Sequence, residues 1–275
     1  MLTYLDTIHD SIPHRVKDVE KAKVYQKIAL SPGITRKNIV SVLALRPTSV
    51  SHIVAELMCQ HLVYEGDIQS DGKKGRPEIS LHINPNILLA IAVYVVSKQL
   101  RAVLINIAGD VLMEHSKDVS SDMRNEEFFN ILVSLIEPLK EATPRGSSIV
   151  GVGLSFFGNF NKIRQELIFS VRWPHIKNFS FKELSKHIGC EVLISTSLEA
   201  KLAHLLLEEP AYKKGGTLLY HWGYGIGATY AMNGELFEST PGYIMEAGHI
   251  AVDVHNKKVC RCGNIGCLET DAAMW

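Results

Sequence analysis

The sequence has no net charge and no long hydrophobic run, and each absence narrows the classes of protein it can encode. Its 29 Lys and Arg residues equal its 29 Asp and Glu residues over 275 positions, which argues against a purely electrostatic nucleic-acid binder. The longest apolar run, residues 87–96, is too short to span a bilayer. The first residues carry neither a basic leader nor an apolar secretory segment. A cytoplasmic protein with room for two domains is therefore expected.

Cysteine is also scarce, and its placement is uneven. Only five cysteines occur, and three of them, Cys260, Cys262 and Cys267, fall within eight residues. The other two, Cys59 and Cys190, are isolated, and we expect them to be buried. Thiols gathered in one cluster indicate a reducing compartment.

The cysteine cluster has the composition of a metal site. His249 lies just upstream, and thiolate with imidazole is the ligand set that Zn²⁺ prefers in a closed structural site. Gly263 and Gly266 allow the chain to turn tightly between the thiols. Glu246 and Glu269 flank the cluster, so that such a site would hold two carboxylates suited to binding a polyol. The alternative is a set of unrelated free or buried cysteines.

This arrangement resembles the zinc motif of the ROK family of repressors, open reading frames and kinases. The ExGH segment ends at His249, and the CxCGxxGCxE segment runs from Cys260 to Glu269. The resemblance implies that His249, Cys260, Cys262 and Cys267 hold a structural Zn²⁺. It also implies that Glu246, His249 and Glu269 face the hydroxyls of a sugar. Alternatively, these residues only support the zinc site.

The N-terminal segment is locally basic and helical. Residues 11–46 carry eight basic and two acidic side chains, a local charge of +6, which fits a small DNA-contacting module. Apolar spacing predicts helices over 17–30, 36–44 and 47–58, with Thr35 as a cap and Pro47 in a first turn. Two strands, 62–65 and 78–83, flank a basic, glycine-rich tip. The order predicts a winged helix-turn-helix over residues 1–83.

The predicted third helix would contact DNA through its first residues. We assign Thr48, Ser49 and His52 to base or groove contacts. The tip residues Lys73, Lys74 and Arg76 are assigned to phosphates or the minor groove. The segment is also similar to the winged helix of ROK repressors, including their Gly-Arg-Pro element at residues 75–77. A helical protein-interaction module is the alternative.

Residues 84–275 alternate strands and helices in an α/β pattern. Strands are predicted over 88–96, 100–107, 111–115, 149–155 and 191–194, with helices over 126–140, 181–187 and 198–208. This is the order of an actin-like, ribonuclease-H-type lobe, expected over about 84–210. A second lobe, over about 211–275, contains the zinc motif. Since ROK proteins usually continue well past this motif, we expect this lobe to be incomplete and the chain to be C-terminally truncated.

The kinase elements of the family are not matched. The family's first phosphate loop reads roughly DIGGTK, whereas this chain has Tyr94-Val-Val-Ser-Lys-Gln99 there. The family's Asn-Asp pair should fall near residues 195–199, where Ser197 takes the place of the catalytic base. A serine hydroxyl cannot act as a carboxylate base. The run Gly223-Tyr-Gly-Ile-Gly227 is only weak evidence for phosphate binding. No enzymatic activity is therefore expected.

These observations lead to one main hypothesis and several alternatives. The chain is interpreted as a zinc-containing ROK transcriptional regulator, of the N-acetylglucosamine or xylose repressor type, with a non-catalytic sugar-kinase body. Its expected partners are operator DNA, a sugar or sugar-phosphate effector and a second copy in a homodimer or larger oligomer. The alternatives are a residual ATP-dependent sugar kinase, a sensor that binds a sugar-transport protein, and a truncated, non-functional product.

Overall fold

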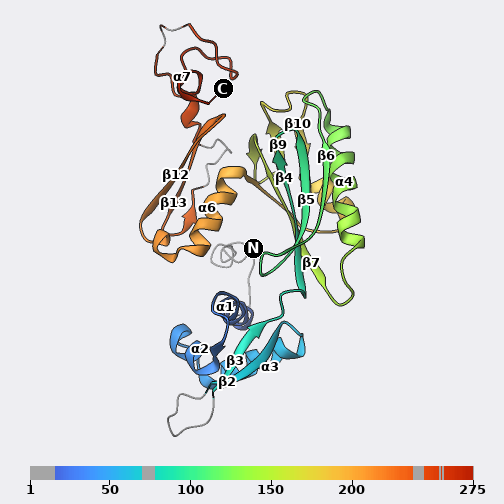
Figure 1. Cartoon of the computed structure of the whole chain (residues 1–275), viewed down its shortest axis with the longest axis vertical. Coiled ribbons are helices and arrows are strands. Elements are labelled where there is room, and N and C mark those ends of the chain that lie inside the picture. The colour runs from blue at the N-terminus through green and yellow to red at the C-terminus, as the bar shows by residue number, and fades with distance from the viewer. Residues whose placement is uncertain (1–15, 70–77, 238–244, 254, 256, 275) are drawn as a thin grey trace. The chain divides into compact units, whose positions relative to one another are not determined.

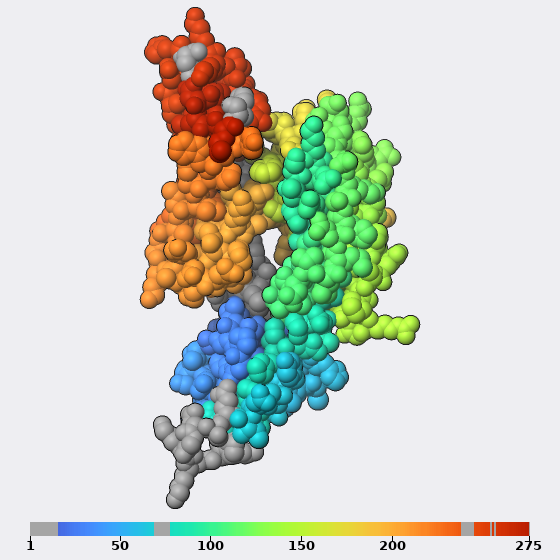
Figure 2. Space-filling view, in the orientation of Figure 1, coloured from blue at the N-terminus to red at the C-terminus, as the bar shows by residue number. Residues whose placement is uncertain are grey.

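A computed structural model describes residues 16–69, 78–237, 245–253, 255 and 257–274. The chain divides into two compact units, drawn as ribbons in Figure 1 and in space-filling form in Figure 2. The first unit comprises Met1–Leu89, Ile105–Asp110 and Pro144–Ser148, and the second comprises the remaining residues. Among the described residues, no helix is both long and apolar enough to cross a membrane.

The first unit combines three helices with a small antiparallel sheet. The helices are α1 (Val16–Leu30), α2 (Arg36–Leu43) and α3 (Pro47–Cys59). The strands β1 (Ile34–Thr35), β2 (Val63–Gln69) and β3 (Glu78–Ile83) form a sheet in the order β1-β3-β2. The three helices lie where the apolar spacing predicts them, and β1 is an addition that the pattern does not reveal.

Local signals explain where these helices begin and end. The Thr35 side chain accepts a hydrogen bond from the Asn38 N–H and caps α2. Ala44 has a left-handed conformation that ends α2, and Pro47 opens α3. The helices and sheet enclose one apolar core, whose fully buried members include Val24, Ile28, Ile39, Val50, Val54 and Leu81.

Residues 84–87, which follow β3, are tied into the first unit by hydrogen bonds. The buried Asn106 side chain donates to Asn86 Oδ1 at 2.9 Å. The Ile107 N–H donates to the Pro85 carbonyl at 3.2 Å, and Ser147 Oγ donates to the Asn86 carbonyl at 2.6 Å. This segment is therefore held on several sides by chain from later in the sequence.

The second unit is built on a five-stranded sheet with the order β11-β7-β4-β5-β6. Its members are β4 (Leu88–Val96), β5 (Gln99–Asn106), β6 (Val111–Asp118), β7 (Ser148–Phe156) and β11 (Val192–Thr196). Helices α4 (Asn125–Glu141) and α5 (Phe181–Ile188) pack against each other and against this sheet. The predicted strands and helices of this region are present.

A small sheet in this unit is missing from the sequence-based prediction. It consists of β8 (Asn159–Asn161), β9 (Glu166–Phe169) and β10 (Lys177–Ser180), each only three or four residues long. A cluster of buried aromatic rings lies beside it, with Phe128 and Trp173 centroids 5.2 Å apart. Strands this short have too few residues to show alternation.

A further sheet has the order β12-β13-β14. Helix α6 (Ser197–Glu208) packs against it. Its strands are β12 (Gly216–Trp222), β13 (Ile226–Met232) and β14 (Glu235–Leu236). The buried side chains Leu202 and Leu206 of α6 pack against Ala231 of β13. Helix α6 therefore covers one face of this sheet.

The expectation that both isolated cysteines are buried is wrong for Cys59. Cys59 is exposed at the last position of α3, and Cys190 is half-buried. The buried positions of α3 are Val50, Ile53, Val54 and Leu57, so the helical repeat places Cys59 off the apolar face.

Candidate metal centre and the residues around it

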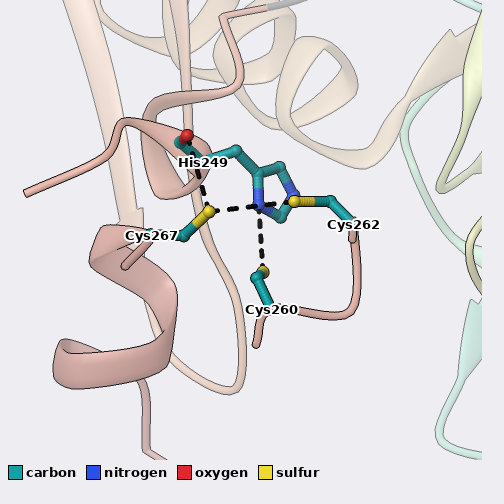
Figure 3. Close-up of side chains that lie close together, drawn as sticks. All are labelled: His249, Cys260, Cys262 and Cys267. Carbon is teal, nitrogen blue, oxygen red and sulfur yellow. Dashed lines mark hydrogen bonds between the residues drawn. The ribbon is translucent and has the colours of Figure 1, made fainter. Parts of the chain in front are cut away.

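His249, Cys260, Cys262 and Cys267 come together at one point of the second unit. Their possible ligand atoms all lie within 4.8 Å of one another. Figure 3 shows the four side chains pointing toward one another. His249 ends the short helix η4 (Ala247–His249), and Cys267 precedes helix α7 (Leu268–Ala272). Isolated bridges between Ala251 and Cys267 and between Val259 and Ile265 hold the loop that carries the thiols.

The turn between the thiols depends on two glycines. Gly263 has φ of 93° and Gly266 has φ of 71°, values that side chains other than glycine rarely adopt. The Gly263 N–H donates to the Cys260 carbonyl at 2.9 Å. The chain thereby reverses direction within a few residues and returns Cys267 toward Cys260 and Cys262, as the glycine spacing predicts.

The distances between ligand atoms fit a tetrahedral ion of zinc size. Cys262 Sγ and Cys267 Sγ lie 3.8 Å apart, and Cys260 Sγ lies 3.5 Å from His249 Nδ1. Bond lengths of about 2.3 Å to sulfur and about 2.0 Å to nitrogen require separations of about 3.8 Å and about 3.5 Å in a tetrahedron. The donor set and its spacing are therefore those of a metal-binding cluster.

The two ring nitrogens of His249 face different partners. Nδ1 points to the Cys260 thiol, whereas Nε2 lies 3.8 Å from Glu246 Oε2. A carboxylate on the outer nitrogen is the usual arrangement for a metal-ligating histidine, because it fixes the ring orientation. Glu246 is thus the carboxylate that lies beside the outer nitrogen of His249.

The thiols differ in how readily they lose a proton. Burial, together with the neighbouring Cys262 and Cys260, raises the pKa of Cys267 to about 12. Burial also opposes ionisation of Cys262, but hydrogen bonds from Asn264, Cys260 and Cys267 outweigh it, so the pKa of Cys262 is lowered. A cation at the centre would favour the thiolate form of both.

Glu269 is buried and bonded to the glycine-containing turn between β12 and β13. Its Oε2 accepts a hydrogen bond from the Ile226 N–H at 2.9 Å, and Arg261 lies 3.8 Å from its Oε1. Burial raises the pKa of Glu246; the charge of His249 opposes this rise, and the nearby Glu269 carboxylate adds to it. Glu246 Oε2 lies 3.8 Å from His249 Nε2, and Glu269 Oε2 would lie 3.1 Å from a Cβ placed on Gly248, so the three side chains are neighbours.

The predicted DNA-contacting residues fall in two groups. Thr48 and His52 are exposed on the first turns of α3, and Ser49 beside them is half-buried. Lys73, Lys74 and Arg76 lie outside the described residues. On the same side of α3, one turn after His52, Glu56 accepts a hydrogen bond from Lys21 at 2.6 Å, which joins α3 to α1.

The segment 195–199 contains an ion pair that the sequence did not suggest. Ser197 is the first residue of α6, and Thr196 with Glu199 forms a capping box at its start. Glu199 is buried; its Oε2 accepts from the Thr196 N–H at 2.8 Å and its Oε1 from Lys162 Nζ at 3.0 Å. The Thr-x-x-Glu spacing could have revealed the capping box, but nothing in the sequence marks Lys162 as the partner.

The turn between β4 and β5, where the sequence lacks a phosphate loop, is a tight hairpin. Ser97 and Lys98 alone connect the two strands, and Ser97 has φ of 53°. The Arg172 guanidinium donates to the Ser97 carbonyl. A cationic side chain of the chain itself therefore lies against this turn.

The fold is an α/β fold, and its cysteine–histidine cluster is one that could hold a metal ion. Residues 90–274 match the model of the ROK family, and the chain belongs to this family. It is 26% identical over 263 residues to a xylose repressor of Caldicellulosiruptor bescii. It is 23% identical over 266 residues to the DNA-binding transcriptional repressor Mlc of Escherichia coli K12. Each alignment covers 94% of this chain and 64% of the relative, so the chain spans less than two thirds of their length.

Solved structures show the same fold. A ROK family transcriptional regulator described as a homologue of the Escherichia coli Mlc protein superposes with a TM-score of 0.75 at 24% identity. That alignment covers 94% of this chain and 65% of the other. A ROK hexokinase from Thermus thermophilus superposes with a TM-score of 0.53 at 20% identity, over 67% of this chain and 60% of the hexokinase.

Proposed function

We propose that the protein is a sequence-specific transcriptional regulator, in the first instance a repressor, of sugar-metabolism genes. In this proposal residues 1–83 are a winged helix-turn-helix domain and residues 84–275 a ROK body, with lobes over about 84–210 and 211–275. The observation that carries it is the exposed start of α3, with Thr48 and His52, attached to a body of the same family as known repressors.

The burial pattern of helix α3 supports a role in major-groove recognition. Its other face is anchored by Val50, Ile53 and Val54 in the core, so its first turns are held rigidly. Thr48, Ser49 and His52 would contact bases or the groove, and Lys73, Lys74 and Arg76 would contact phosphates or the minor groove. The short turn at residues 44–46 between α2 and α3 supports this assignment.

The metal of the centre is proposed to be a structural Zn²⁺ held by His249, Cys260, Cys262 and Cys267. Three thiols, one imidazole and tetrahedral spacing favour zinc over cations that prefer oxygen ligands. All four protein ligands would be used, which leaves no open position for catalysis. The ion would then fix the loop that carries Glu246 and Glu269.

The body is proposed to bind a sugar or sugar phosphate without phosphorylating it. Glu199 is the only carboxylate within residues 195–199, and Lys162 and the Thr196 N–H engage both of its oxygens, so no free base is present there. Glu246, His249 and Glu269 would accept or donate hydrogen bonds to the sugar hydroxyls. The effector would lower operator affinity by binding two states of the protein unequally.

The proposed regulator would act in the cytoplasm as a homodimer or larger oligomer on a palindromic operator, because two half-sites require two recognition helices. Selection of bound sequences from a random DNA pool, with and without a panel of sugars, tests the proposal. We expect an inverted repeat to be enriched and one sugar to release it. The double variant Thr48→Ala with His52→Ala should lose specific binding, whereas Cys59→Ala, at the far end of the same helix, should retain it.

Three outcomes would contradict the regulator proposal. If folded, metal-loaded protein enriches no DNA sequence, the proposed sequence-specific DNA binding is wrong. ADP release in the presence of hexoses, abolished by Glu246→Ala, would establish a residual kinase instead. Capture of a sugar-transport protein from membranes, with no effect of free sugars on DNA binding, would assign the sensing step to that partner.

A further inference from the structure

The unit that carries the proposed DNA-binding helices does not end with β3. It also contains Ile105–Asp110 and Pro144–Ser148, two segments from later in the sequence. Its apolar core extends in the same way, because Leu88 and Ile107 pack against the buried cluster that α1, α2 and α3 enclose. Residues 84–87, which connect β3 to β4, are therefore part of this unit and not a free linker.

The buried side-chain amide of Asn106 uses its full hydrogen-bonding capacity. Its Oδ1 accepts from the N–H groups of Ala108 and Asp110 at 3.0 and 2.9 Å. Its Nδ2 donates to Asp110 Oδ2 at 3.0 Å and to Asn86 Oδ1 at 2.9 Å. An asparagine amide has two acceptor lone pairs and two donor hydrogens. A buried polar group that is satisfied in this way holds its partners in one arrangement.

Only one of these four bonds leaves the turn between β5 and β6, and it goes to Asn86. The Asn86 carbonyl also accepts from Ser147 Oγ at 2.6 Å. The next carbonyl, that of Ile87, accepts from the Ser148 N–H at 2.8 Å. The chain between β3 and β4 is thus bonded both to the end of β5 and to the start of β7.

The strands that supply these bonds continue into the second unit. Strands β4, β5 and β7 have only their end residues in the first unit, and they are neighbours in the five-stranded sheet. Strand β3 is the central strand of the small sheet, in the order β1-β3-β2. A shift at the end of β5 or the start of β7 would therefore reach β3 through a short and bonded segment, which has little freedom to absorb it.

We propose that the hydrogen bond between Asn106 and Asn86 transmits the effector response of the body to the DNA-binding unit. Asn106 is the positioning residue in this coupling, and it contacts neither DNA nor effector. The inference rests on the proposed function, because it requires a protein that binds both an operator and a sugar or sugar phosphate. Without the bond, residues 84–87 would follow β5 less closely, so each ligand would alter the affinity for the other by a smaller factor.

Operator affinity with and without sugar tests this coupling. The probe is a fluorescently labelled duplex of the inverted repeat enriched from the random pool, titrated with a panel of pentoses, hexoses and N-acetylhexosamines, free and phosphorylated. At saturation, the most effective sugar should weaken operator binding by the wild type by a factor of roughly 5–150, as is typical of allosteric coupling. In Asn86→Ala, which leaves the bonds within the Asn106 turn intact, this factor should fall to about two.

Three further variants separate the coupling from a loss of stability. Asn86→Asp keeps an acceptor oxygen for Asn106 at an exposed position and should retain the wild-type factor. Ser147→Ala removes the bond to the Asn86 carbonyl and should lower the factor. Asn125→Ala is the matched control, since this amide bonds to the Lys177 backbone in the second unit, and it should respond as the wild type does. Calorimetry without DNA should give Asn86→Ala an unchanged affinity for the sugar.

Several results would overturn the proposal, and they are distinguishable. If the wild type responds to a sugar and Asn86→Ala responds by the same factor, transmission through Asn106 is wrong and the proposed function stands. If Asn125→Ala loses the response equally, the loss is a general one and the assignment to Asn106 is also wrong. A wild type that binds no operator, or none of the sugars, would overturn the proposed function and the coupling together.

Discussion

The Glu269 carboxylate accepts a hydrogen bond from the backbone N–H of Ile226, 43 residues earlier in the sequence, at 2.9 Å. The bond joins the start of α7, directly after the ligand Cys267, to the first residue of β13. Glu269 Oε2 would also lie only 3.1 Å from a Cβ placed on Gly248, beside the ligand His249. One buried carboxylate thus links the cysteine–histidine cluster to the adjoining sheet.

Replacement of Glu269 by alanine should destabilise the second unit. The Ile226 N–H would remain buried without an acceptor, at a cost of about 1–3 kcal/mol. Glu269→Gln should lose less, since its amide oxygen can still accept the bond. Thermal unfolding of both variants measures the difference. Equal losses in the two variants would show that charge, and not the hydrogen bond to Ile226, gives Glu269 its importance.

Gly248→Ala should disturb the metal centre through sterics alone. A Cβ at Gly248 would lie 2.4 Å from the Ile226 carbonyl oxygen, a backbone atom that cannot rotate away. The turn that carries His249 would have to shift, at a cost of about 1–3 kcal/mol. We expect a lower melting temperature and weaker metal retention. Gly153→Ala is the control, because its Cβ would meet its nearest neighbour at an ordinary 4.0 Å.

Cys262→Ser should reduce the metal content well below one ion per chain. The substitution replaces a thiolate by a hydroxyl, which is a far weaker zinc ligand. Cys59→Ser, at an equally exposed but isolated thiol, should retain full metal. Metal analysis after dialysis against a chelator compares the two. Full occupancy in Cys262→Ser would contradict the proposed ligand set.

Metal affinity should also fall as the pH is lowered. The pKa of Cys267 is raised to about 12 by burial and by its neighbouring thiols, so metal binding must displace a proton at neutral pH. Proton release on titration with Zn²⁺, followed in weakly buffered solution, measures this directly. Binding that releases no proton would place the ion on other residues.

The sequence predicts elements well where a local signal marks them. The Thr35 cap and Pro47 define α2 and α3, and the apolar run from Leu88 defines β4 with its observed bounds. The metal cluster is also predictable, because its ligands lie close together in the chain and two glycines turn it. In each case the information lies in one short stretch of chain, of which the longest, from His249 to Cys267, holds the cluster.

Long-range pairings leave no such mark. The Lys162 bond to Glu199 spans 37 residues, and the Asn106 bond to Asn86 spans 20. The short strands β8, β9 and β10 are stabilised by pairing with one another rather than by an alternating pattern. His249 likewise contacts Cys260 through Nδ1 and Glu246 through Nε2, and this ring orientation depends on the fold.

Loss of Lys162 should destabilise the start of α6. Lys162→Met would leave the buried Glu199 carboxylate with only the Thr196 N–H as a partner. An unpaired buried charge costs about 3–5 kcal/mol, and since the lysine side chain is 26% exposed, we expect about 2 kcal/mol. The double variant with Glu199→Gln should recover much of this loss. Chemical denaturation of the single and double variants provides the test, and a single variant as stable as the parent would show that water replaces the lysine.

The first unit should lose stability in acid, because protonation of Glu78 removes a stabilising contribution. Hydrogen bonds from Lys37 and Thr35, at 2.8 and 2.7 Å, lower the pKa of Glu78 in the folded state. A lowered pKa means that the ionised form is favoured by folding, so this contribution is fully present above the unfolded pKa of about 4.3. It is lost as the pH falls through the lower folded value. The free energy of unfolding should therefore decline in this window, and Glu78→Gln should flatten the decline.

Glu141→Gln, which removes an exposed carboxylate at the end of α4, is the matched control. If the two variants respond alike between pH 5 and about pH 3, the bonds to Lys37 and Thr35 contribute nothing specific, and the acid sensitivity reflects overall charge.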